Sequence, residues 1–243
     1  MASLRFLLEI AAGSLESVIA AQAGGADRVE LCGSLEDGGV TPSYGTIAVA
    51  REHLRIPLYV LIRPRAGDFV YSPAELESMH LDVEACARLG CDGVVIGALD
   101  ALGAVDVAAC RSLVAAAGAL GATFHRAFDC VEDRRAALDA VVALGCQRIL
   151  TSGRADSAEQ GAPVIAADIA HADGRIALMP GAGITPANVA AVAQATGAAE
   201  FHASARAFAP GIGREGPAGL ARGYWQSTEA SVRGLREALD ASV

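Results

Sequence analysis

The sequence of 243 residues predicts one α/β domain that spans residues 1–243 and folds as a (β/α)8, or TIM, barrel. Short apolar runs alternate with alanine-rich stretches of helical periodicity, which is the pattern of repeated βα units. Glycine closes five of these helices three or four residues before the next apolar run, as at Gly25 and Gly90. The apolar runs recur about every 20 to 35 residues, the length of one βα unit.

Eight runs fit buried strands, and in order they cover residues 6–10, 28–32, 58–63, 93–98, 122–125, 148–152, 176–180 and 200–203. Most of them are apolar throughout, as expected for parallel strands that are covered on both faces. A doubly wound parallel sheet would show the same alternation and is the structural alternative.

Helix starts with proline in the first turn mark three of the intervening helices. Ser72 precedes Pro73, and Glu75 is placed to complete a capping box. Thr41-Pro42 and Thr185-Pro186 repeat the cap and proline pattern. Three loops, at residues 33–42, 64–72 and 204–227, are longer than a bare connection needs. All three follow strands, so we expect them at the barrel end that carries chemistry in this fold.

Composition and charge exclude several classes of protein. Hydrophobic residues make up 53% of the chain and charged residues 19%, which excludes a disordered protein. The net charge of −9 argues against a nucleic-acid partner, because such binding depends on basic residues that neutralise phosphates. No apolar run reaches the roughly 20 residues that a membrane span needs. The run at residues 6–10 is too short for a secretion signal, so we expect a cytoplasmic protein with reduced cysteines and no membrane partner.

Polar side chains fall among the last positions of six of the predicted strands. They are Glu9, Glu30, Arg63, His125, Ser152 and His202. At one axial level they would form a ring around the mouth of the barrel, where buried charges are costly unless they are paired. Two carboxylates facing two histidines would suit general acid/base catalysis. The structural alternatives are a Glu30–Arg63 ion pair that fixes strand register and histidines that are satisfied within the core.

A second candidate site follows the seventh predicted strand at Gly181-Ala182-Gly183. Its glycines let backbone N–H groups approach a ligand just before a helix N-terminus, which favours anions. Ser204, after the eighth strand, and Ser152-Gly153, after the sixth, offer similar groups. The alternative is that the glycines serve only a tight turn. The G-x-G-x-x-G pattern at residues 211–216 follows no strand and does not predict dinucleotide binding.

Two cysteines, Cys32 and Cys130, are nearest the strand-end face. Thiolate ligands select Cu(I), so a copper site built from Cys32, Cys130 or His125 is one prediction. The alternative is that each thiol acts as a small hydrophobic side chain.

Eight segments, taken in order, resemble the CutC copper homeostasis family. They are LEI (8–10), DRVELC (27–32), GGVTPS (38–43), IRPRAGDF (62–69), TFHRAFD (123–129), LTSG (150–153), GAG (181–183) and HAS (202–204). The resemblance implies a TIM barrel, a cytoplasmic homo-oligomer, and a role in copper homeostasis with bound copper. It also brings Asp129 in among the candidate catalytic residues. The chain has Val70, Ala11 and Ala12 where family members often carry cysteines, so fewer thiols lie near the mouth.

Two functions remain open on this sequence. The first is a CutC-like cytoplasmic protein of copper homeostasis that binds copper ions, with Cys32 and Cys130 as metal ligands. The second is an enzyme or sensor of a small phosphorylated or carboxylated metabolite. Its residues are Glu9 or Glu30 as base, His125 or His202 as acid, Arg63 and Arg65 as an anion clamp, and Gly181, Gly183 and Ser204 as the phosphate site.

Overall fold

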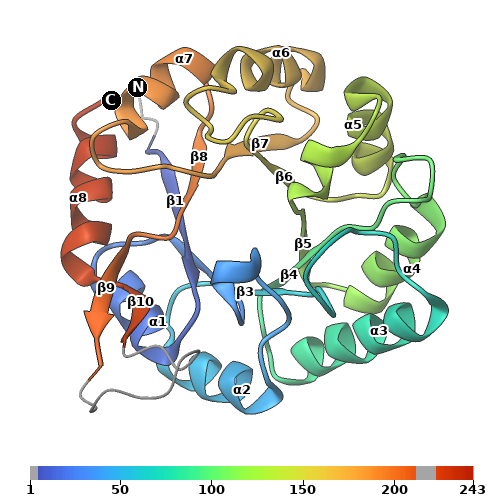
Figure 1. The fold of residues 1–243 in the computed structure, drawn as a ribbon, viewed down its shortest axis with the longest axis horizontal. Coiled ribbons are helices and arrows are strands. Elements are labelled where there is room, and N and C mark those ends of the chain that lie inside the picture. The colour runs from blue at the N-terminus through green and yellow to red at the C-terminus, as the bar shows by residue number, and fades with distance from the viewer. Residues whose placement is uncertain (1–4, 212–222, 243) are drawn as a thin grey trace.

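Eight parallel strands form a ring that helices surround in the computed structural model, which describes residues 5–211 and 223–242 (Figure 1). The strands are β1 (Leu7–Ala12), β2 (Arg28–Leu31), β3 (Leu58–Leu61), β4 (Gly93–Ile96), β5 (Gly121–Phe124), β6 (Arg148–Thr151), β7 (Ala177–Pro180) and β8 (Glu200–Ala203). Backbone ladders join them in the order β7-β6-β5-β4-β3-β2-β1-β8. Within the described residues no ladder joins β7 to β8, although the two strands lie side by side and complete the ring. The predicted TIM barrel is confirmed, and the doubly wound alternative is wrong.

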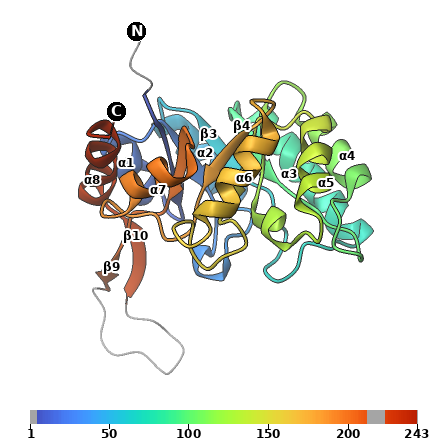
Figure 2. The same ribbon diagram turned by 90° about the horizontal axis from the view of Figure 1, so that it is seen from above.

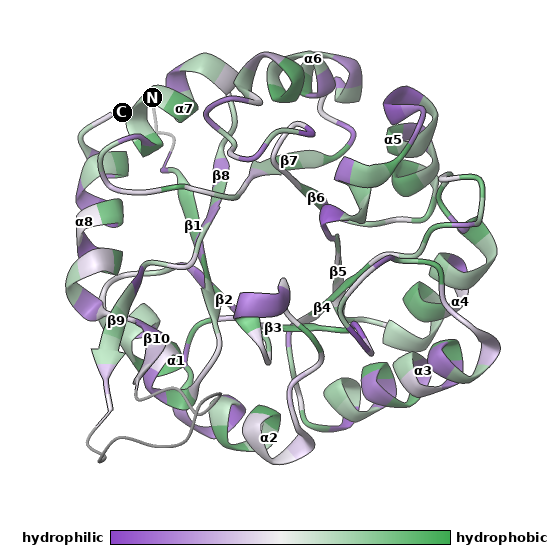
Figure 3. Cartoon of the chain, viewed as in Figure 1, coloured by the Kyte–Doolittle hydropathy of each residue, from purple (hydrophilic) through white to green (hydrophobic). Residues whose placement is uncertain are grey.

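Helices cover the outer face of the ring. They are α1 (Leu15–Ala23), α2 (Tyr44–His53), α3 (Pro73–Arg88), α4 (Val107–Ala117), α5 (Arg134–Ala143), α6 (Ala162–Ala172), α7 (Val189–Thr196) and α8 (Glu229–Asp240), with two short 3₁₀ helices, η1 (Leu35–Asp37) and η2 (Arg126–Cys130). Hydrophobic and hydrophilic bands alternate along α3, as expected for a helix with one face against the sheet (Figure 3).

One of the three predicted helix starts is confirmed. Ser72 caps α3, and its hydroxyl and the Glu75 carboxylate form the expected capping box. The prediction at Thr41 is wrong, because α2 begins at Tyr44 and the Thr41 hydroxyl instead accepts a hydrogen bond from the backbone N–H of Arg63. The prediction at Thr185 is also wrong, since a turn over residues 186–188 precedes α7.

The two faces of the strands differ in chemistry. Leu8 and Ile10 on β1 pack in the main hydrophobic core against the helices. Since side chains alternate along a strand, Glu9 between them points into the ring. Tyr59 on β3 also points inward, and glycine makes room for it, because a Cβ at Gly93 would lie 2.2 Å from its Cε1. The interior of the ring is therefore partly polar.

An antiparallel hairpin follows β8 and projects from the barrel (Figure 2). It pairs β9 (Arg206–Pro210) with β10 (Gly223–Ser227). The expectation of one continuous loop over residues 204–227 is wrong at these two strands, because the glycines and prolines of this segment hide the pairing. Most of the G-x-G-x-x-G pattern lies outside the described residues. Across residues 5–211 and 223–242, none of the helices combines the length and the apolar character of a bilayer span.

Candidate functional site

A cavity of about 470 Å³ opens at the carboxyl ends of the strands. Its polar and charged lining comprises Glu30, Cys32, Arg63, His125, Arg126, Thr185, His202, Ser204, Arg206 and Ser231. The predicted long loops after β2, β3 and β8 all contribute to this lining, which places them at one end of the barrel as expected. Loop length after a strand was therefore a useful signal for the position of the site.

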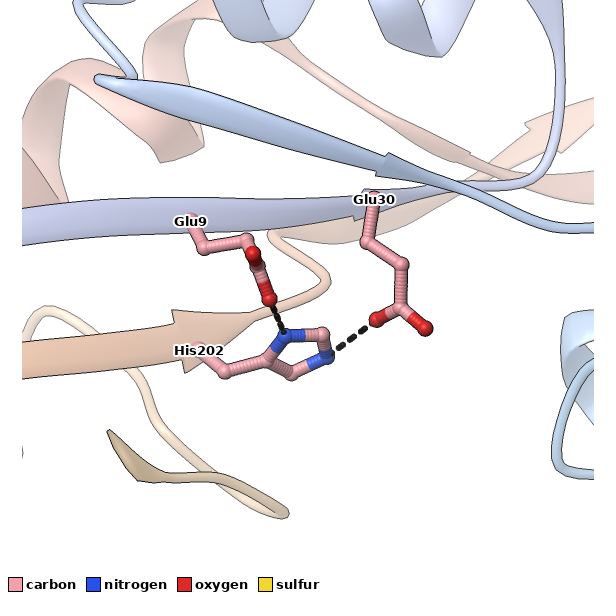
Figure 4. Close-up of side chains that lie close together, drawn as sticks. All are labelled: Glu9, Glu30 and His202. Atoms are coloured by element: carbon pink, nitrogen blue, oxygen red, sulfur yellow. Dashed lines mark hydrogen bonds and ion pairs between the residues drawn. The ribbon is translucent and has the colours of Figure 1, made fainter. Parts of the chain in front are cut away.

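Three of the predicted strand-end residues, Glu9, Glu30 and His202, lie close together (Figure 4), and two of them, Glu30 and His202, line this cavity. The imidazole of His202 lies between two carboxylates, with its Nδ1 2.7 Å from Oε1 of Glu9 and its Nε2 3.4 Å from Oε2 of Glu30. Strand register produces this contact, because Glu9 is paired with His202 across β1 and β8. Glu30 is paired with Ala11, one inward position further along β1. The predicted ring at one axial level is therefore wrong, because β1 continues to Ala12 and leaves Glu9 deeper than Glu30.

A charged network lies beneath the three residues. Arg28 donates to Glu9 through Nε, and its Nη2 lies 3.0 Å from Oε2 of Glu200. Arg148 contacts the same Glu200 oxygen at 2.9 Å. The two arginines also flank Tyr59, whose ring centroid lies 5.0 Å from the Arg28 guanidinium carbon. This network was not predicted, although a charged residue at the first position of β2, β6 and β8 was a visible signal.

The network separates the proton affinities of the two carboxylates. Burial raises the pKa of Glu9, but the Arg28 charge and the His202 hydrogen bond outweigh burial and lower that pKa to about 2. Burial dominates at Glu30 and raises its pKa to about 7. Burial lowers the pKa of His202, but its bond to Glu9 and the charges of Glu30 and Glu9 raise it above its usual value. Near neutral pH, Glu9 is therefore ionised and Glu30 is close to its pKa, while His202 holds its second proton more firmly than a free imidazole does.

The Arg63 guanidinium does not pair with Glu30, so the predicted register-fixing ion pair is wrong. Its Nη1 donates to the carbonyl of Gly39 at 2.8 Å, and its Nη2 donates to the carbonyl of Gly67 at 2.7 Å. Arg63 thus ties the loop after β2 to the loop after β3, on the wall of the cavity. The sequence did not show that backbone carbonyls of both loops lie within hydrogen-bond distance of Arg63.

A buried imidazole, His125, forms another part of the wall. Its Nδ1 accepts the backbone N–H of Ala127 at 3.1 Å, and its ring centroid lies 5.0 Å from that of Phe69. Burial and the nearby Arg63 charge lower the pKa of His125 to about 3, so the ring is neutral at physiological pH. As the acid that the sequence suggested, it could donate a proton there only from its neutral form.

Several predicted residues have structural contacts outside the cavity. Asp129 accepts the Thr151 hydroxyl at 2.5 Å and the Ser152 hydroxyl at 3.1 Å, and so joins η2 to the end of β6. Arg65 contacts Glu75 at 2.6 Å in the loop before α3. Gly153 donates its N–H to Thr151, which closes a local turn.

Of the predicted anion-binding residues, Gly183 and Ser204 reach the cavity lining. Gly181 lies behind it, where a Cβ would meet Leu150 Cδ1 at 2.5 Å. Ala182 and Gly183, which both line the cavity, have positive φ values of 78° and 70°. Within the described residues, no acceptor is recorded for the backbone N–H groups of Gly183 and Ile184.

The two candidate copper ligands are not brought together. Cys32 is buried in the cavity wall and its thiol donates to the Ala12 carbonyl, while Cys130 is exposed and lies outside the lining. Burial and the Glu30 charge raise the pKa of the Cys32 thiol. In the described part of the chain, the group of potential metal ligands that does converge is Glu9, Glu30 and His202, which contains no sulfur.

Residues 6–207 match the model of the CutC family. The chain belongs to the CutC family. A CutC family protein of Xanthomonas axonopodis pv. citri is 62% identical over 199 residues, covering 82% of this chain and 83% of the relative. A CutC family protein of Chromobacterium violaceum is 53% identical and covers 96% of this chain and 98% of its own. The crystal structure described as a copper homeostasis protein CutC from Streptococcus agalactiae has a TM-score of 0.79, with 35% identity over 82% of this chain and 98% of that chain.

Proposed function

We propose that this chain is an enzyme that transfers protons on a small anionic metabolite, with Glu30 and His202 as its acid/base pair. The observation that carries the proposal is their 3.4 Å contact at the floor of an open cavity, with the pKa of Glu30 raised to about 7. A general base is most effective when its pKa lies near the working pH. Glu9 holds the other nitrogen of the imidazole, and so fixes the ring in place.

The charge of the cavity favours an anionic substrate. Among the described residues, the guanidinium groups of Arg63, Arg126 and Arg206 and the carboxylate of Glu30 line it. Arg126 also pairs with Asp129 and Arg206 with Glu36, whereas the Arg63 guanidinium donates to backbone carbonyls. The backbone N–H groups at Gly183 and Ile184 add neutral donors at the mouth. A phosphorylated or carboxylated molecule would find complementary charge on the wall and the proton-transfer pair below it.

Deuterium incorporation from heavy water tests the proposal even when the product is unidentified. The protein is incubated in D₂O with sugar phosphates, 2-oxo acids, hydroxy acids and amino acids, and loss of C–H signals is followed by NMR. We expect exchange with at least one compound, and Glu30→Gln should slow it by about 10² to 10⁴-fold. Glu84→Gln, at an exposed site on α3, is the matched control and should leave the rate unchanged. Exchange that is equally fast in Glu30→Gln would refute the proposal.

A role in copper homeostasis is the second candidate, favoured by the name of the S. agalactiae relative and by the thiol of Cys32 at the cavity. The residues in place do not fit a resident Cu(I) centre. Only one of the two predicted sulfur ligands faces the cavity, and the Glu9, Glu30 and His202 cluster supplies oxygen and nitrogen instead of thiolate. No step of the proposed reaction therefore involves copper.

Anaerobic titration of the reduced protein with Cu(I) against a competing chelator tests this second candidate. Direct copper handling predicts one-to-one binding that Cys32→Ser removes and that Cys130→Ser leaves unchanged. Absence of binding above the competitor would reject it. In either role we propose a cytoplasmic protein that self-associates; its six cysteines, free in the structure, support a reducing compartment, and light scattering tests the association.

A further inference from the structure

The side chain of His125 presents a buried donor without an acceptor. Because Nδ1 accepts the Ala127 N–H, the neutral ring carries its proton on Nε2. Nε2 is buried and has no hydrogen-bond partner within the described residues, although His125 lines the cavity. Buried polar groups are nearly always paired, so this N–H, on a residue of the cavity lining, is where a water molecule or a ligand atom would complete the hydrogen bonding of the ring.

The surroundings fix the position and the charge of this ring. Phe69 packs on it, and Gly97 leaves the space that it occupies, since a Cβ at Gly97 would lie 2.5 Å from the ring Cε1. Arg63 is the charged group that acts on the ring, and its positive charge works with burial against a second proton. The ring therefore stays a neutral N–H donor across the physiological pH range.

A fixed neutral donor has a specific use beside a base. It can hydrogen-bond an oxygen on which negative charge develops, and it does so without giving up its own proton. Enzymes that remove a proton next to a carbonyl group combine a carboxylate base with a neutral imidazole in this way. His125 and Glu30 line the same cavity, which is what such a pairing requires.

We propose that His125 donates its Nε2–H to the carbonyl oxygen of the substrate while Glu30 removes a proton from the adjacent carbon. This inference rests on the proposed function and narrows its substrate to small anionic compounds with a C–H next to a carbonyl. The C–H electron pair forms a C=C bond, and the carbonyl π electrons move onto the oxygen that His125 holds. The proton on Glu30 is replaced by one from the solvent and returns to the same carbon as the electron pair on oxygen re-forms the carbonyl, so the hydrogen is exchanged with no oxidant or reductant.

The experiment compares probes and variants in D₂O. Dihydroxyacetone phosphate, ribulose 5-phosphate and 2-oxobutyrate are the carbonyl probes, and glycerol 3-phosphate is the matched compound without a carbonyl. We expect exchange with at least one carbonyl probe and none with glycerol 3-phosphate. His125→Ala should slow exchange by about 10² to 10³-fold. His125→Gln, whose amide N–H reaches a similar position, should recover part of the rate.

The outcomes separate this inference from the proposed function. Exchange that needs Glu30 but is unaffected by His125→Ala overturns the inference and leaves the proposed function standing. Exchange that is seen only with compounds without a carbonyl also overturns the inference and leaves the proposed function standing. Exchange that is insensitive to Glu30→Gln rejects the proposed function itself. Absence of exchange with all three carbonyl probes also overturns the inference.

NMR of the ¹⁵N-labelled histidine rings provides a readout that a purely structural role would not change. We expect the His125 signals to show the Nε2–H tautomer without titration between pH 5 and 8, which follows from a pKa of about 3. Addition of 2-phosphoglycolate, which resembles an enediolate, should shift the Nε2 proton of His125. A ring that gains a second proton within this pH range, or a signal that 2-phosphoglycolate leaves in place, contradicts the inference.

Discussion

The Nδ1 atom of His202 lies 2.7 Å from Oε1 of Glu9, and this contact joins the last strand of the barrel to the first. Glu9 also accepts from Arg28, so its carboxylate is shared between a guanidinium and an imidazole. The Nδ1 side of the imidazole therefore faces the ionised carboxylate of Glu9. The other side faces Glu30 and the cavity, where a proton can be exchanged.

Removing the charge of Glu9 should destabilise the fold strongly. Glu9→Gln leaves Arg28 buried with only Glu200 as a charged partner, and breaking a buried pair costs about 3–5 kcal/mol. The free energy of unfolding, measured by urea denaturation at pH 7, provides the check. Glu84→Gln removes an exposed pair with Arg88 and should cost less than about 1 kcal/mol. Equal effects of the two changes would show that the Glu9 pair is not buried in solution.

The stability of the protein should fall as pH rises from 5 to 8. Glu30 has its pKa raised to about 7 in the fold, from 4.5, so the folded state holds its proton where the unfolded state has lost it. The raised pKa of His202 acts in the same direction. The stability that it contributes to the fold is complete below pH 6.5 and is lost as the pH rises through the pKa of the folded state. The Glu30 contribution amounts to about 2–3 kcal/mol over this range.

Glu30→Gln isolates that contribution. The variant should gain stability relative to the wild type between pH 5 and pH 8, because the neutral amide has no proton to lose. Denaturation of both proteins at the two pH values gives the difference in their free energies of unfolding. Groups that titrate alike in both proteins do not contribute to this difference. If the wild type loses no stability relative to the variant, then ionisation of Glu30 does not destabilise the folded state. The sign is opposite to that expected from a Glu30–Arg63 ion pair.

A methyl group at Gly97 should disturb His125. The new Cβ would lie 2.5 Å from the ring, and overpacking of this kind costs about 1–3 kcal/mol. Gly45→Ala is the control, because nothing lies within 4 Å of a Cβ there and alanine favours the helix α2 by about 0.5–1 kcal/mol. Thermal unfolding and the NMR signals of His125 measure both effects. A His125 signal that does not move in Gly97→Ala would contradict this close packing.

Arg63→Lys should loosen the two loops that Arg63 ties together. A single ammonium group cannot reach the carbonyls of Gly39 and Gly67 as the two guanidinium nitrogens do. We expect a loss of about 1–3 kcal/mol and faster hydrogen exchange at residues 33–43 and 64–72. Arg55→Lys, at an exposed position after α2, should change neither quantity. Unchanged exchange in both loops would mean that other contacts hold them.

The fold was predictable because each βα unit carries its own local signals. Apolar runs placed all eight strands, and polar residues near their ends, such as Glu30 and His202, line the same cavity. Depth along the barrel was not predictable, since it depends on register between strands: Glu9 is the fourth of five residues in the predicted run 6–10 but the third of six residues in β1. Arg28 and Arg148 were overlooked because a charge at the start of a buried strand has meaning only when its partner on β8 is known.

The imidazole of His202 lies on β8, the last barrel strand to be translated. His202 leaves the ribosome 193 residues after Glu9, and Glu200, the second partner of Arg28, emerges with it. A nascent chain that ends before β8 therefore holds Glu9, Arg28 and Glu30 but lacks the imidazole that contacts both carboxylates. The proposed acid/base pair is therefore complete only after β8 has been synthesised.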